Sequence, residues 1–157
     1  MIIPIIVIFA LFAMDQVSKH IVRLSIGLYE KNEVISRFFY ITHIENEGAA
    51  WGMLQGSRWI FVSVTVIMIT VLFTYMLKTK KNLYRYAGAI VIGGGLGNLC
   101  DRIISGKVVD FLDFYFWGYD FPVFNLSDTF VVIGTIFLAS LIIFTEKVKT
   151  DDTHGNK

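Results

Sequence analysis

The sequence is poor in the residues that build disulfides and metal sites. It contains one cysteine, Cys100, and three histidines among 157 residues. A single cysteine cannot form an intrachain disulfide, and no C-x-x-C or H-x-x-x-H spacing is present to hold a metal ion. We therefore expect no metal site and no organic cofactor.

An excess of charge of one sign is also lacking. The 14 basic and 13 acidic residues give a formal net charge of +1 at pH 7. Proteins that bind nucleic acid need a positive surface, because it replaces the counterions of the phosphate backbone. The even charge balance therefore argues against nucleic acid as a partner.

Hydrophobic residues, by contrast, are more abundant than one soluble core of this size can bury. They make up 55% of the chain, and the mean hydropathy is +0.61. A small domain keeps much of its surface in water, so this excess of apolar side chains needs another environment. The composition predicts a membrane protein.

Four stretches approach the roughly 20 residues with which a helix crosses about 30 Å of hydrocarbon. We predict spans at about residues 1–22, 59–77, 84–104 and 129–146. The third stretch is rich in glycine and has the weakest hydropathy. We still predict that it spans the membrane, because four crossings are needed to place both basic segments of the chain on the same side. We expect the first stretch to be a span and not a signal peptide, because Asp15 and Lys19 interrupt it and a basic start is missing.

The loop charges predict the orientation of these spans. Basic residues gather between the second and third spans and after the fourth, at Lys78, Lys80, Lys81, Arg85, Lys147 and Lys149. By the positive-inside rule, we expect both termini and the tail 147–157 to be cytoplasmic. Segments 24–58 and 105–128 are then extracytoplasmic, and the active site is expected near that face.

The first outer segment adds a small β-containing part to an otherwise helical fold. Around residues 33–42, apolar and polar side chains alternate, which is typical of a short strand or two on the membrane surface. The second outer segment is dense in aromatic residues, as in the headgroup layer. The expected fold class is thus an all-α membrane protein with four transmembrane helices, a small extracytoplasmic β segment and one domain, 1–157.

Ionisable residues inside spans are functional candidates, because each costs about 2.5 kcal/mol or more on insertion scales. Asp15 and Lys19 are four residues apart and can pair on one helix face, which favours structural support. Asn98, Asp101 and Arg102 share another helix face. The preceding glycines, at positions 93–95 and 97, favour close helix packing.

Asp110 and Asp128 lie in short apolar settings, V-V-D-F and F-N-L-S-D. Burial beside a second carboxylate is a physical reason for such neighbours. Repulsion and desolvation raise the pKa of one member of a carboxylate pair, which leaves an acid and a base together at neutral pH. That combination suits the attack of water on an amide. Asp128 can instead, or in addition, cap the fourth helix.

Five ordered motifs together resemble bacterial lipoprotein signal peptidase (signal peptidase II) over essentially the whole chain. They are Asp15-Gln16-Val17-Ser18-Lys19, Asn46-Glu47-Gly48-Ala49-Ala50-Trp51-Gly52, Gly97-Asn98-Leu99-Cys100-Asp101-Arg102, Val108-Val109-Asp110-Phe111 and Phe124-Asn125-Leu126-Ser127-Asp128. The resemblance implies an aspartic endopeptidase that removes the signal peptide of prolipoproteins before their diacylglyceryl-modified cysteine. It also implies that this modified prolipoprotein and membrane phospholipid are the partners. We expect a monomer.

The resemblance also implies a role for each matching residue. Asp110 and Asp128 match the catalytic pair. The positions that match the substrate-binding site are Asn46, Gly48, Asn98, Arg102 and Asn125. Those that we interpret as structural polar support are Asp15, Lys19 and Asp101.

Two further hypotheses come from the residues. The aromatic side chains of Trp51, Tyr115, Trp117 and Tyr119 could form a flap over the site, although interfacial anchoring explains each of them singly. A small four-span transporter or proton channel is the alternative function, since intramembrane charges also line ion pathways. It is disfavoured because the charges gather at one end of the spans, and a non-enzymatic scaffold ranks last because it does not explain the paired aspartates.

Overall fold

The chain folds into four long helices and one small antiparallel sheet. Its computed structural model describes residues 1–48 and 53–154. The helices are α1 (Ile2–Ser25), α2 (Arg58–Lys78), α3 (Asn82–Ile104) and α4 (Leu126–His154). All four are long and apolar enough to cross a membrane, α4 over Leu126–Phe144. The predicted fold class is confirmed.

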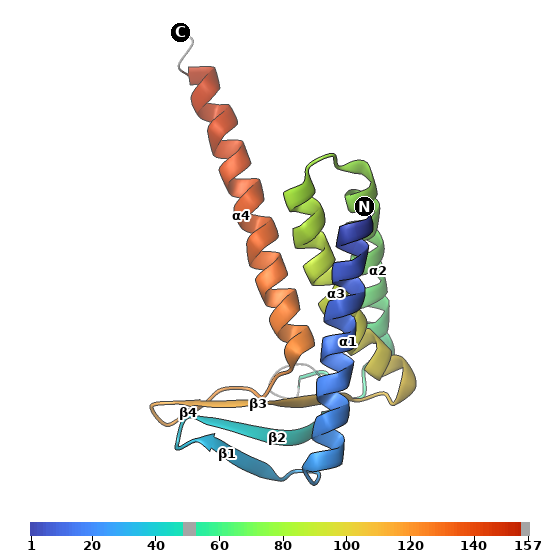
Figure 1. Cartoon of the computed structure of the whole chain (residues 1–157), viewed down its shortest axis with the longest axis vertical. Helices are drawn as coiled ribbons and strands as arrows, with labels where there is room; N and C mark the ends of the chain where they lie inside the picture. Colours follow the sequence, from blue (N-terminus) through green and yellow to red (C-terminus); the bar gives the residue numbers. More distant parts are fainter. Residues whose placement is uncertain (49–52, 155–157) are drawn as a thin grey trace.

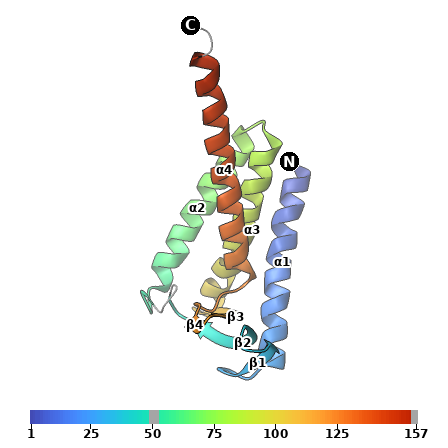
Figure 2. The same cartoon turned by 90° about the vertical axis from the view of Figure 1, so that its left-hand side faces the viewer.

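Helix α3 is the centre of the bundle (Figures 1 and 2). It packs against each of the other three helices, and 61% of its most apolar window is buried, against 22% or less in the others. Its glycines make this possible, because Gly93 faces α1, Gly94 faces α4 and Gly95 faces α2. The predicted packing role of the glycine run is therefore confirmed.

The sheet lies across the end of the bundle that is opposite both termini and the α2–α3 loop (Figure 1). Its strands are β1 (Lys31–Ile35), β2 (Phe39–Asn46), β3 (Val108–Phe116) and β4 (Tyr119–Asp120), in the order β1-β2-β3-β4. Both outer segments of the sequence contribute to it. The strands predicted around residues 33–42 are confirmed, whereas β3 was not predicted from the sequence.

A bulge in β2 changes which face of the sheet its side chains occupy. Ile41 lies opposite Leu112, but Ile44 lies opposite Asp110, so β2 holds one residue more than β3 between these pairs. Such a bulge shifts the alternation of side chains by one. As a result Asn46, opposite Val108, shares a face with Asp110.

Helix α4 differs from its predicted bounds at both ends. It begins at Leu126 and continues to His154, whereas the sequence predicted a span from 129 to 146. The start is earlier because Asn125, and not Asp128, precedes the first turn and accepts a hydrogen bond from it. Asp128 therefore lies inside the first turn, and its prediction as the residue that precedes the helix was wrong.

Candidate active site

A cavity of about 500 Å³ opens between the sheet and the sheet-facing ends of α3 and α4. The residues on its polar side are Asn46, Gly48, Asn98, Arg102, Asp110, Asp128 and Thr129. The apolar remainder comes from Val108, the segment Phe121–Phe124, and Val132 and Ile133 of α4. The cavity thus joins a small polar centre to a wide apolar wall, the usual composition of a ligand site.

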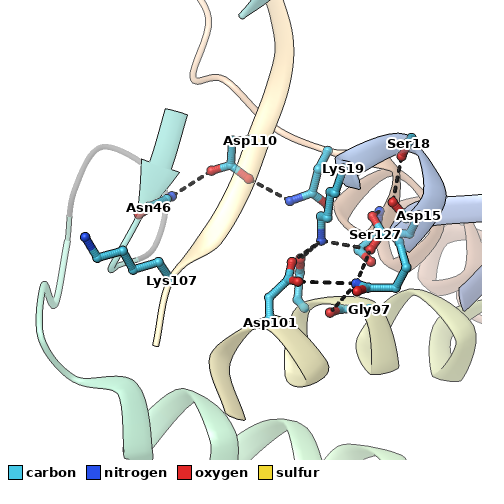
Figure 3. Close-up of polar contacts among 12 residues, drawn as sticks. Asp15, Ser18, Lys19, Asn46, Gly97, Asp101, Lys107, Asp110 and Ser127 are labelled. Carbon is cyan, nitrogen blue, oxygen red and sulfur yellow. Dashed lines mark hydrogen bonds and ion pairs between the residues drawn. The ribbon is translucent and has the colours of Figure 1, made fainter. Parts of the chain in front are cut away.

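Asp110 reaches the cavity from β3 and is 4% exposed. Its carboxyl group accepts a hydrogen bond from Asn46 Nδ2 at 2.9 Å (Figure 3) and another from Asn125 Nδ2 at 2.6 Å. Burial, and then repulsion by the charge of Asp128, raises the pKa of Asp110 to about 7, although the two amides act in the opposite direction. This carboxyl group can therefore exchange a proton near neutral pH.

Asp128 lies in the first turn of α4, where the unpaired backbone N–H groups of the helix favour negative charge. Asn98 Nδ2 donates to its Oδ1 at 2.7 Å, and the backbone N–H of Asn125 donates to its Oδ2 at 3.2 Å. The N–H of Asp128 in turn donates to Asn125 Oδ1 at 3.0 Å. This reciprocal pair has the pattern of a capping box.

Asn125 therefore connects the two carboxyl groups. Its backbone N–H holds Asp128 and its side-chain amide holds Asp110, while its own side chain is fully buried. It does not line the cavity. Asn125 thus lies behind the pair, and its contact with substrate stays a prediction.

The other expected binding residues do lie on the cavity wall, but two of them face the aspartates. The side-chain N–H groups of Asn46 and Asn98 donate to Asp110 and Asp128. Arg102 also lines the cavity. Its guanidinium group lies 4.7 Å from the centre of the Phe61 ring.

Gly48 joins Arg102 to Asn46 at the edge of the cavity. Arg102 Nη2 donates to the carbonyl oxygen of Gly48 at 3.3 Å, and the N–H of Gly48 donates to Asn46 Oδ1 at 2.8 Å. A Cβ at this position would lie 2.5 Å from the carbonyl oxygen of Met53. The close approach expected at Gly48 is thus one between two parts of this chain's own backbone.

The three residues expected as polar support form one cluster behind the cavity. Fully buried Lys19 lies 2.8 Å from Asp15 and 2.8 Å from Asp101, as Figure 3 shows. Asp15 Oδ1 accepts the backbone N–H of Ser127 at 2.9 Å. The cluster thus ties α1, α3 and the start of α4 together.

Sequence reasoning missed several residues of this site. Gln16 donates to Asp101 and to the carbonyl oxygen of Gly97, and Ser127 donates to Asp15. Thr129 and Val132 line the cavity beside Asp128. The helical spacing of positions 128, 129 and 132 is a signal that could have predicted them.

The aromatic flap hypothesis gains no support from the described residues. Trp51 lies outside them, and Tyr115, Trp117 and Tyr119 do not line the cavity. Phe121 and Phe124 line it in their place. In residues 1–48 and 53–154, no group of three His, Cys, Asp or Glu side chains could hold a metal ion.

Comparisons with known proteins agree on one family. The family model described as Signal peptidase (SPase) II matches residues 7–144. A lipoprotein signal peptidase of Caldanaerobacter subterraneus is 45% identical over 145 residues, which cover 89% of this chain and 94% of the relative. One of Staphylococcus haemolyticus is 40% identical over 138 residues, or 87% of each chain.

Solved structures agree with this assignment. A structure described as a bacterial membrane enzyme at 2.3 Å resolution is 33% identical, with a TM-score of 0.83, and the match covers 98% of this chain and 91% of the other. A second, at 1.9 Å resolution, is 35% identical with a TM-score of 0.80 and covers 88% and 91%. The expected membrane location is confirmed. With both sequence and fold matched over most of its length, the chain belongs to the signal peptidase II family of peptidases.

Proposed function

We propose that this peptidase hydrolyses the bond before the diacylglyceryl-modified cysteine of prolipoproteins, and that Asp110 and Asp128 activate the attacking water. One observation carries the aspartic mechanism: the carboxyl groups of buried Asp110 and half-buried Asp128 line one cavity and share Asn125 as a hydrogen-bond donor. Because each carboxylate raises the cost of charge on the other, the pair holds one proton at neutral pH.

The chemistry needs no group beyond this pair and water. The ionised carboxylate takes a proton from water as the water oxygen attacks the amide carbon, and the protonated carboxyl gives its proton to the carbonyl oxygen. The tetrahedral intermediate then collapses: the C–N bond breaks, the leaving nitrogen receives a proton from the pair, and a hydroxyl proton of the intermediate returns to the pair as the carbonyl group re-forms. Arg102, on the cavity wall, is the cation that can stabilise negative charge on the carbonyl oxygen before that oxygen is protonated.

The apolar wall of the cavity is evidence for a lipid-modified substrate. Val132 and Ile133 line the cavity and are also 55% and 53% exposed on the outer surface of α4. In a membrane that exposed surface faces lipid, so a substrate can reach the aspartates sideways while its acyl chains stay in the bilayer. Membrane phospholipid then surrounds the site, and one chain supplies every residue that the mechanism uses.

The location of the basic residues is evidence that the active site lies on the extracytoplasmic side of the membrane. Lys78 ends α2, and Lys80 and Lys81 follow in the α2–α3 loop, at the same end of the bundle as both termini. By the positive-inside rule, this end of the bundle is cytoplasmic. The sheet and the aspartates then belong to the outer face of the bacterial cell membrane.

Cleavage should depend on the lipid of the substrate. We expect the purified protein to cleave a diacylglyceryl-modified prolipoprotein at least about tenfold faster than the unlipidated precursor, because the acyl chains anchor the modified cysteine in the bilayer beside the cavity, at about 0.8 kcal/mol per buried CH₂ group. A gel shift measures both rates. Equal cleavage of the two precursors would contradict the proposed substrate class, while leaving the peptidase assignment intact.

The pH dependence of the reaction tests the shared proton. The raised pKa of Asp110, about 7, means that the pair keeps its proton below this pH and loses it above. We therefore expect kcat/KM to fall as the pH rises through about 7, because the acid that protonates the carbonyl oxygen is lost. Initial rates on the lipidated precursor across this range measure the profile. A constant rate through neutral pH into the alkaline range would exclude a carboxyl acid of this kind.

We do not propose the transporter or proton channel. Among the described residues, the buried charged groups Asp15, Lys19, Asp101 and Asp110 gather at the sheet end of the bundle. No buried charged side chain is found in α2 or in the first half of α3 among these residues. An ion pathway needs polar groups through the full depth of the membrane.

A further inference from the structure

Lys19 makes one contact that the neutralisation of charge does not explain. Its ammonium group already lies 2.8 Å from Asp15 Oδ2 and 2.8 Å from Asp101 Oδ2. Besides these two ion pairs, Lys19 Nζ donates a hydrogen bond, 3.0 Å long, to Asn98 Oδ1. An ammonium group has N–H donors and no acceptor.

This hydrogen bond determines the orientation of the Asn98 amide. Because Lys19 can only donate, the oxygen of Asn98 must face it, and the amide nitrogen must face the other way. That nitrogen donates to Asp128 Oδ1 at 2.7 Å. The positive charge of Lys19 therefore polarises an N–H group that points at Asp128, as in other chains of hydrogen bonds.

The two aspartates differ in how well they can carry negative charge. Asp128 lies at the N-terminal end of α4 and receives the backbone N–H of Asn125 as well as the Lys19-polarised amide. Asp110 lies on a strand and receives two side-chain amides. The oxygens of those amides accept backbone N–H groups, of Gly48 and of Asp128, and not a cation.

Other charged groups around the pair do not reverse this difference. Arg102 of α3 contacts the carbonyl oxygen of Gly48, and neither aspartate is within ion-pair distance of it among the described contacts. Asp15 of α1 and Asp101 of α3 are paired with Lys19, and Asp101 also with Arg23, so this cluster has two charges of each sign. The cation connected to one member of the pair through a hydrogen-bonded amide is thus Lys19.

We propose that Lys19, acting through Asn98, is a positioning residue that holds the negative charge of the pair on Asp128. Asp128 is then the base that takes the proton from water, and Asp110 is the acid that protonates the carbonyl oxygen. After attack, Asp128 passes its new proton to the leaving nitrogen as the C–N bond breaks, and Asp110 takes back a proton from a hydroxyl group of the intermediate as the carbonyl group re-forms. A new water molecule then restores the starting state. The roles in catalysis rest on the proposed function, whereas the location of the charge can be measured without turnover.

Infrared titration of single variants tests the location of the charge. The carboxylic acid C=O band is followed against pH in Asp128→Asn, where Asp110 remains, and in Asp110→Asn, where Asp128 remains. We expect Asp110 to keep its proton to a higher pH than Asp128. Adding Lys19→Met to Asp110→Asn should narrow the gap between the two midpoints by about one pH unit, a tenfold change in equilibrium. Equal or reversed midpoints, or an unchanged gap, overturn the proposal.

The pH–rate profile separates positioning from structural support. Arg23→Gln is the matched control, because Arg23 Nη2 lies 3.6 Å from Asp101 Oδ1 in the same cluster, whereas the described side-chain hydrogen bonds of Asn98 go to Lys19 and Asp128. Both variants remove one positive charge. We expect only Lys19→Met to move the low-pH side of the kcat/KM profile to higher pH, by about one unit. Equal shifts in both variants, or none in Lys19→Met, overturn the proposal.

If Lys19→Met does not fold, a third variant can replace it in the test. Lys19→Met with Asp101→Asn removes one charge of each sign from the cluster and still deletes the donor to Asn98. It should show the same shift of the profile. An inactive wild-type protein would contradict the proposed function alone, and the infrared titration would still decide where the charge lies.

Discussion

Replacement of Asp110 or of Asp128 by asparagine is expected to lower kcat/KM by about 10²–10⁴-fold, the usual contribution of general acid–base catalysis. Asparagine preserves the shape of the side chain but can neither take a proton from water nor supply one. The fold should survive, because each change removes one of two like charges that line the same cavity. Cleavage of the lipidated precursor measures the loss, and thermal unfolding in detergent measures the stability.

Asp113→Asn is the matched control for these variants. Asp113 lies on the same strand as Asp110 and is equally buried, at 4% exposure, but it does not line the cavity. Its replacement should leave kcat/KM unchanged. If either variant of the pair keeps the wild-type rate, that residue is not catalytic; if Asp113→Asn is as inactive as they are, loss of strand β3 explains all three.

Replacement of Gly97 by alanine is expected to destabilise the protein by at least ~1–3 kcal/mol, as overpacking of a filled core does. A Cβ at Gly97 would overlap Ser127 Oγ and the carboxyl group of Asp15. Asp15 cannot move freely, because it holds both Lys19 and the backbone N–H of Ser127. The first turn of α4, which carries Asp128, should therefore shift, and activity should fall together with the unfolding temperature.

Gly95→Ala, two residues earlier on α3, controls for the loss of a glycine in a helix. Its Cβ would meet the terminal methyl group of Met68, at 2.8 Å, which can rotate away. We expect a small change in the unfolding temperature and nearly wild-type cleavage. If Gly97→Ala is as stable and active as Gly95→Ala, then close packing between α3 and Asp15 does not hold the site together.

Much of the site could be predicted from single residues. Asp110 and Asp128 were selected because carboxylates are costly in apolar settings, and Asp15 and Lys19 because they are four residues apart on a helix. Both arguments use neighbours in the sequence only. The ion pair between Asp15 and Lys19 is confirmed by the structure.

The partners of the aspartates could not be predicted in this way. Asn46 is 64 residues from Asp110, and Asn98 is 30 residues from Asp128. The bulge in β2 decides that Asn46 shares a face with Asp110, and no sequence pattern signalled that extra residue. Amides expected to bind substrate are therefore found to hold the carboxyl groups.

The sequence by itself determined the four spans, the close packing of the glycine-rich helix and the two candidate aspartates. Each depends on a local quantity: the length of an apolar run, the absence of side chains, or the cost of charge among apolar neighbours. Only the tertiary structure decided that Asn125 joins the two carboxyl groups and that Lys19 reaches Asp128 through Asn98. A hydrogen bond depends on the position and direction of two groups to within a fraction of an ångström, and these are set by how α1, α3, α4 and the sheet pack together.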